Sequence, residues 1–123
     1  MIRLLTLAVA VSFLSLSLAF AAHSPASKTL TILSEPVDPA CYISQGLKGE
    51  GHKQCATACH KAGQSLALLS DDGSLFFTIE GKPGTSPDEQ LVPFIGTKVK
   101  VTGKVYESNG TKGMVVEKVE PMK

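Results

Sequence analysis

The sequence predicts a small, mainly β domain with one or two short helices. Three observations lead to this fold class: five short segments with strand-like patterns, two tight-turn signatures between four of them, and one helix-forming segment bounded by glycines. The chain has 123 residues, 43% of them hydrophobic, which suits one domain with a modest core and leaves no room for two.

Three strands are expected in the first part of the domain. Residues 29–33 alternate polar and apolar side chains, as a half-buried strand does. Residues 65–69 and 75–79 flank Asp71-Asp72-Gly73, which is a tight-turn signature. We therefore expect these two segments to form a hairpin.

Two further strands are expected near the C-terminus. Residues 98–106 alternate almost perfectly, and residues 114–119 follow the hairpin-turn signal Asn109-Gly110. Gly103 interrupts the apolar face of the first of these strands, which indicates a bulge or a sharp bend at that point.

Helical segments are expected at two places between the strands. Residues 50–62 are rich in helix formers and are followed by Gly63, a typical residue just after a helix end. Residues 87–92 predict one or two helical turns, with Pro87 near the first position. The resulting order of elements resembles an OB-like five-stranded small barrel. An open α+β sheet with the helix packed on one face is the alternative.

The charge balance argues against a nucleic-acid-binding protein. The chain has 12 Lys+Arg against 11 Asp+Glu, a formal net charge of +1, whereas nucleic-acid-binding domains usually carry a strong basic excess. We therefore expect no nucleic-acid partner.

The N-terminal segment predicts export from the cytosol. Arg3 precedes an apolar run that ends in Ala19-Phe20-Ala21, with small residues where signal peptidase requires them. This predicts a signal peptide over residues 1–22, cleaved after Ala21 or Ala22, rather than a membrane anchor. Residues 23–28 predict a disordered leader and residues 29–123 the domain. The mature protein is then periplasmic or secreted and has no stable membrane anchor.

The residues with the strongest chemical signal are three cysteines and a histidine. Cys41, Cys55 and Cys59 fall within nineteen residues, and His52, Cys55 and Cys59 have the spacing i, i+3, i+7 on the expected helix. At about 100° per residue these three share one helix face, and the preceding loop with Cys41 is long enough to fold over it. The sequence therefore predicts a Cys3His metal site of Cys41, His52, Cys55 and Cys59, suited to Zn²⁺ or Cu(I).

A disulfide is the main alternative to the metal site. Cysteines exported to an oxidising compartment commonly pair. A Cys55–Cys59 bridge within one helix is awkward because the Cβ vectors run parallel, whereas Cys41 reaches either helical cysteine more easily. This alternative predicts a disulfide-clamped domain that binds another envelope protein. A thiol redox protein that uses Cys55 and Cys59 is a third hypothesis.

Two catalytic or cofactor roles are less favoured by the same residues. The run Cys55-Ala56-Thr57-Ala58-Cys59-His60 is one residue longer than the C-x-x-C-H motif of c-type haem attachment, so haem is not expected. A cysteine nucleophile with His52 or His60 as its base has no evident Asp or Asn to orient that base. These residues favour a binding module over an enzyme.

The cysteine and histidine residues also carry a family resemblance. The runs Val37-Asp38-Pro39-Ala40-Cys41-Tyr42 and Gly49-Glu50-Gly51-His52-Lys53-Gln54-Cys55-Ala56, followed by Cys59 and Gly63, resemble a family of small exported bacterial proteins. Its members share a D-x-x-C-Y run and a G-x-x-H-x-x-C-A-x-x-C-x-x-x-G run. The resemblance implies an OB-like exported domain with a shared Cys/His cluster and implies no activity.

The leading hypothesis is an exported metal-binding module with a structural or metal-handling role. Four protein ligands close the coordination sphere, whereas a catalytic zinc keeps one position open. The partners that fit this role are a metal donor or acceptor, or another protein of the cell envelope.

Overall fold

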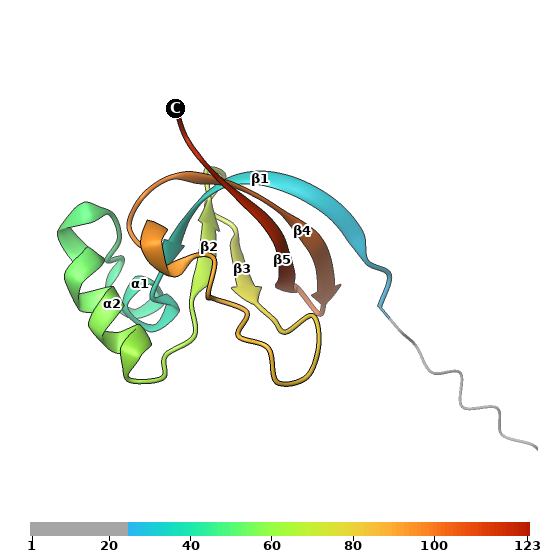
Figure 1. The fold of residues 1–123 in the computed structure, drawn as a ribbon, viewed down its shortest axis with the longest axis horizontal. Coiled ribbons are helices and arrows are strands. Elements are labelled where there is room, and N and C mark those ends of the chain that lie inside the picture. Colours follow the sequence, from blue (N-terminus) through green and yellow to red (C-terminus); the bar gives the residue numbers. More distant parts are fainter. Residues whose placement is uncertain (1–24) are drawn as a thin grey trace, which may run out of the picture.

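Residues 25–123, which a computed structural model describes, form a closed barrel of five strands with two short helices beside it (Figure 1). The strands are β1 (Lys28–Val37), β2 (Ala67–Ser70), β3 (Leu75–Thr78), β4 (Val99–Ser108) and β5 (Thr111–Pro121). Around the barrel they follow the order β1-β2-β3-β5-β4, and β3 and β5 are the parallel pair. The predicted OB-like small barrel is confirmed, and the open sheet is not formed.

All five predicted strands are present, and β1 is longer than predicted. Its first part pairs with β4 over residues 28–34, and its last part pairs with β2 over residues 34–37. The second part was missed because Ser34-Glu35-Pro36-Val37 lacks alternation. β1 therefore lies between β4 and β2 in the barrel, and it ends at Val37, directly before Asp38 and α1.

The β4–β5 hairpin has the turn and the bulge that the sequence predicts. Asn109 and Gly110 have φ of 49° and 81°, as the two central residues of a tight hairpin turn require. The register of β4 against β5 shifts between Thr102 and Gly103. A Cβ atom on Gly103 would lie 2.2 Å from the Val115 carbonyl oxygen, so the strands approach this closely only because residue 103 is glycine.

The helical segments differ in part from the prediction. The predicted helix at 50–62 is a 3-10 turn, η1 (Glu50–His52), followed by α2 (Lys53–Lys61). The segment with Cys41, predicted as a loop, is a short helix, α1 (Pro39–Gln45), because Asp38 and Pro39 begin it. The segment predicted to be helical at 87–92 forms turns, and a 3-10 turn, η2 (Val92–Phe94), follows.

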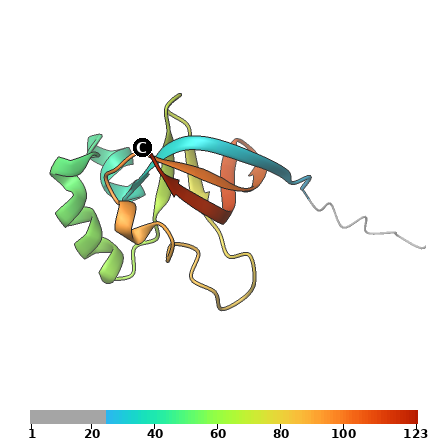
Figure 2. The same cartoon turned by 45° about the horizontal axis from the view of Figure 1, so that its top comes forward.

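The core fills the inside of the barrel, and both helices lie at one side of it. The fully buried side chains include Leu66, Leu68, Val101 and Met114, and Ala56 joins α2 to this core. Figures 1 and 2 both place α1 and α2 next to each other on the same side of the barrel. No helix within residues 25–123 is long and apolar enough to cross a membrane. The predicted signal peptide (1–22) and the start of the leader lie outside the described residues.

Candidate metal site

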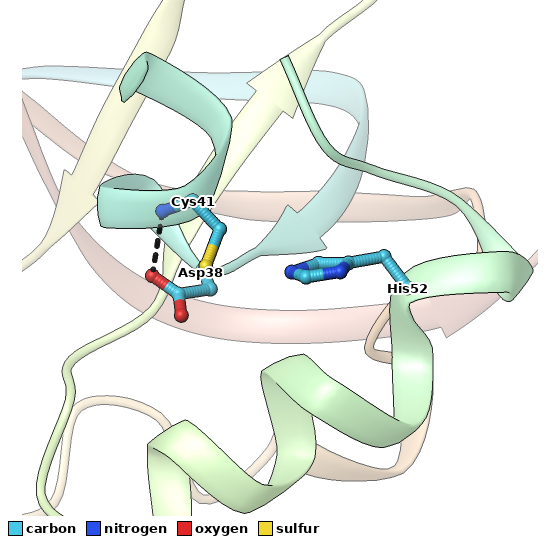
Figure 3. Close-up of side chains that lie close together, drawn as sticks. All are labelled: Asp38, Cys41 and His52. Atoms are coloured by element: carbon cyan, nitrogen blue, oxygen red, sulfur yellow. Dashed lines mark hydrogen bonds between the residues drawn. The ribbon is translucent and has the colours of Figure 1, made fainter. Parts of the chain in front are cut away.

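Three potential metal ligands converge where β1, α1 and η1 meet. One ligand atom each of Asp38, Cys41 and His52 lies within 4.8 Å of the others. Figure 3 shows the Cys41 thiol next to the Asp38 carboxylate, with the His52 imidazole pointing toward both. A carboxylate, a thiol and an imidazole are the three kinds of side chain that bind Zn²⁺ in proteins.

Asp38 is placed by its role at the start of α1. Its carboxylate accepts hydrogen bonds from the backbone N–H groups of Ala40 at 2.8 Å and Cys41 at 3.3 Å, which caps the helix. The residue is only 1% exposed. Because the cap fixes the first turn of α1, it also holds the Cys41 side chain next to the same carboxylate.

His52 is placed by contacts of the preceding turn with the barrel. The Glu35 carboxylate of β1 accepts a hydrogen bond from the Gly49 N–H at 2.5 Å. Thr97 donates its hydroxyl proton to the Glu50 carboxylate at 2.9 Å. A Cβ atom on Gly96 would lie 2.7 Å from the Gly49 carbonyl oxygen, so the turn approaches the barrel closely at this glycine. These contacts set η1, and His52 at its end faces α1.

The Nε2 atom of His52 is buried and has no hydrogen-bond partner. Among the described residues, one other buried side-chain polar atom shares this property, the Ser34 hydroxyl oxygen inside the barrel. A buried polar atom without a partner costs about 1–3 kcal/mol, so native proteins usually pair it. The His52 ring faces a carboxylate and a thiol, where a cation would supply the missing partner.

Cys55 and Cys59 lie on α2, and neither belongs to this cluster. Taking the buried Ala56 as the centre of the packed face, Cys59 lies about 60° and Cys55 about 100° around the same flank. Cys59 is half-buried, and its thiol is not one of the three ligand atoms that lie within 4.8 Å of one another. Cys55 is exposed.

The Asp38 carboxylate affects how readily the thiols of Cys41 and Cys59 lose a proton. Burial alone would raise the pKa of Asp38, but hydrogen bonds from the Cys41 N–H, from both thiols and from Ala40 lower it below its ordinary value. Burial and the Asp38 carboxylate together raise the pKa of the Cys41 thiol. The hydrogen bond to Asp38, followed by burial, raises the pKa of the Cys59 thiol to about 11. The cluster therefore holds one negative charge readily and resists further ones unless a cation joins it.

The structure thus brings together Cys41 and His52 of the predicted set and adds Asp38. The two other predicted ligands, Cys55 and Cys59, are not part of this group within 4.8 Å. Asp38 was missed because the sequence argument considered only cysteine and histidine. Its position before Pro39 is a typical helix start, and this signal would have placed its carboxylate in the same turn as Cys41.

His60 belongs to a separate polar network. Its Nδ1 donates to the Gln64 carbonyl at 2.9 Å and lies 3.7 Å from a carboxylate oxygen of Asp88. On the helix, His60 is on the opposite flank of Ala56 from Cys59.

No protein-family model, no curated protein and no solved structure matches this chain.

Proposed function

We propose that this protein is a metal-binding module that holds one thiophilic transition-metal cation between β1, α1 and the helical segment η1–α2. The observation that carries the proposal is the buried, unpaired Nε2 of His52, which faces the carboxylate of Asp38 and the thiol of Cys41. An imidazole needs no other change to become a ligand there, because its free nitrogen already faces the cluster.

The proposed ligands are Asp38, Cys41, His52 and Cys59. Cys59 is proposed as the fourth because it belongs to the sequence-based set and, unlike Cys55, is half-buried on α2. Cys55, a ligand in the sequence-based set, is exposed and lies further around the helix. We therefore prefer Asp38 to Cys55 as the ligand that completes the set.

This ligand set favours Zn²⁺ over Cu(I). Zn²⁺ accepts carboxylate, imidazole and thiolate ligands in tetrahedral sites, whereas Cu(I) prefers soft sulfur ligands. Four protein ligands leave no open position for a reacting water, so a structural or metal-carrying role fits better than hydrolysis. If the chain is exported, as its N-terminal segment predicts, its partners are metal donors or acceptors outside the cytosol.

Metal analysis of the protein purified without oxygen or chelator tests the proposal. We expect about one equivalent of zinc or copper, with Cys41 and Cys59 protected from alkylation. His52→Ala removes a ligand and should weaken zinc binding by at least about 10–100-fold, the loss typical of disturbing even the residues behind a metal ligand.

His60→Ala is the matched control because it removes the same side chain from the other flank of α2. Zinc affinity in this variant should equal that of the wild type. A reduced protein that takes up neither metal, or an equal loss in both histidine variants, would disprove the proposed site.

A further inference from the structure

We infer that this protein forms a symmetric dimer in which the first part of β1, residues 29–33, pairs antiparallel with the same residues of a second copy. This inference goes beyond the proposed function, because it concerns the opposite end of β1 from the candidate metal site and needs no bound metal. It rests on a free strand edge and on the self-complementary sequence of that edge.

The first part of β1 is paired on one side only. Residues 28–34 pair with β4, whereas the pairing of β1 with β2 covers only residues 34–37. No other backbone hydrogen bond reaches residues 28–33 from the part of the chain that the structure describes. Figures 1 and 2 both show this part of β1 at the outside of the barrel, next to β4. Its outer edge therefore carries backbone N–H and C=O groups with which another strand can pair.

This edge lacks the features that usually keep a strand from pairing with another chain. Such features are charged side chains, proline and β-bulges. Residues 29–33 contain neither a charged residue nor proline, and their pairing with β4 has no irregularity. Leu33, a large apolar residue of this segment, is 42% exposed. The edge is thus open to a second strand.

The other long free edge among the described strands, residues 115–121 of β5, is protected. It carries the exposed charged residues Glu117 and Lys118, and Pro121 lies at its end. The 79–91 connection also runs beside its start, since a Cβ atom on Gly81 would lie 2.9 Å from the Cγ1 atom of Val115. The contrast between the two edges points to β1 as the contact.

The sequence of the β1 edge is complementary to itself. In antiparallel pairing centred on Thr31, Leu30 of one copy lies opposite Ile32 of the other. Leu30 and Ile32 are half-buried and pack against the core, so this pairing continues the apolar face of each barrel across the contact. On the other face, Thr29 of one copy lies opposite the exposed Leu33 of the other. A second copy of the chain therefore fits this edge and leaves no charge unpaired.

The neighbouring registers fit less well. A two-fold axis perpendicular to the sheet keeps the inner faces of both strands on the same side, so a residue of the edge must lie on the axis. With Leu30 on the axis, Ile32 would lie opposite the charged Lys28. With Ile32 on the axis, the pairing would extend to Ser34, which already pairs with β2.

Sedimentation analysis of the reduced mature chain over a range of concentrations tests the dimer, and the reducing agent excludes disulfide-linked dimers. Five residues per copy form a small interface, so we expect an equilibrium between monomer and dimer. The measured mass should rise from that of one chain toward that of two as the concentration approaches about 1 mM.

Charges on the axis test the register. Thr31→Lys places two lysines opposite each other and should weaken the dimer at least about 10-fold, because like charges directly opposite each other are unfavourable. Thr31→Glu should have the same effect. An equimolar mixture of the two variants should restore the dimer, because each lysine then lies opposite a glutamate.

Thr102→Lys is the matched control. The hydroxyl groups of Thr31 and Thr102 share a hydrogen bond of 2.8 Å between β1 and β4, so both variants lose this bond and gain the same charge. Residue 102 lies one strand further from the axis, and this variant should dimerise like the wild type. Far-UV circular dichroism checks that each variant is folded.

Three results would overturn the inference. They are a wild-type chain that stays monomeric up to about 1 mM, a folded Thr31→Lys variant that dimerises as tightly as the wild type, and a Lys/Glu mixture that stays monomeric. None of them concerns the ligands of the candidate metal site, so the proposed function stands or falls separately, by metal analysis.

Discussion

Asp38 combines two tasks that are usually given to different residues. Its carboxylate caps α1 through the N–H groups of Ala40 and Cys41, and it lies within 4.8 Å of the ligand atoms of Cys41 and His52. A carboxylate has two oxygens with several lone pairs, so it can accept these hydrogen bonds and still bind a cation. The same residue therefore couples the start of a helix to the candidate metal site.

Substitution at residue 38 separates these two tasks. Asn caps helices about as well as Asp, so Asp38→Asn should cost less than about 1 kcal/mol of unfolding free energy. It should nevertheless weaken zinc binding by at least about 10-fold, because the anionic ligand is lost. Asp38→Ala removes the cap as well and should cost a further 0.5–2 kcal/mol or so.

Zinc competition titration and urea unfolding of the two Asp38 variants measure these effects. If Asp38→Asn binds zinc as tightly as the wild type, the carboxylate is a cap only, and another group completes the ligand set.

At the scale of the elements, Gly103 explains how β4 and β5 fit into a closed barrel. The register shift at Thr102/Gly103 bends the hairpin, so that β4 pairs with β1 on its other side. Residue 103 must lack a side chain because the Val115 backbone occupies the space where a Cβ would lie. This bulge, together with the pairing of β1 to both β4 and β2, favours the closed barrel over an open sheet.

Gly103→Ala should therefore destabilise the fold by about 1–3 kcal/mol, the usual cost of forcing extra atoms into a packed region. Gly51→Ala is the control, because a Cβ there meets nothing within 4 Å. Its stability should stay within about 0.5 kcal/mol of the wild type. Equal unfolding free energies for the two variants, measured in urea, would show that the contact at Gly103 relaxes without cost.

At the scale of the whole molecule, Asp88 joins the long 79–91 connection to the barrel and to α2. It is 3% exposed, accepts the Leu66 N–H at 3.0 Å and the Thr78 hydroxyl, and lies 3.7 Å from the His60 Nδ1. These contacts tie together the connection, the barrel and the end of α2. The helix that carries the candidate ligands is thus held from both ends, by Glu35 and Gly49 on one side and by Asp88 on the other.

Asp88→Ala should cost about 1–3 kcal/mol or more of unfolding free energy, because it leaves the buried Leu66 N–H without an acceptor. The control is Asp71→Ala, which removes an exposed carboxylate that pairs with Lys98 at 2.6 Å. An exposed ion pair of this kind contributes about 0–1 kcal/mol. Thermal or urea unfolding of both variants decides the matter, and a cost for Asp88→Ala no larger than for Asp71→Ala would contradict this role.

Local patterns in the sequence were enough to predict most of the fold. Alternation predicted two of the strands, and turn signatures predicted the other three. Asn109-Gly110 predicted a turn that needs positive φ, and Gly103 predicted a bulge that needs the absence of a Cβ. These features involve residues that are close in the chain, so their cause is visible in a short segment. The α1 helix was missed because seven residues, about two turns, are too few to show a repeated helical pattern of apolar residues. Its only signal in the sequence is the helix start at Asp38 and Pro39.

The candidate site depends on contacts between distant segments. The sequence pointed to Cys41 and His52, but it assigned the same helix face to Cys55 and Cys59 because spacing alone does not show where the packed face ends. The burial of Ala56 sets that limit. The hydrogen bond that the Gly49 N–H donates to the Glu35 carboxylate, fourteen residues away, sets where His52 faces. The sequence thus identifies Cys41 and His52 as candidate ligands. The packing of β1 against η1 determines that they lie close to each other and to Asp38.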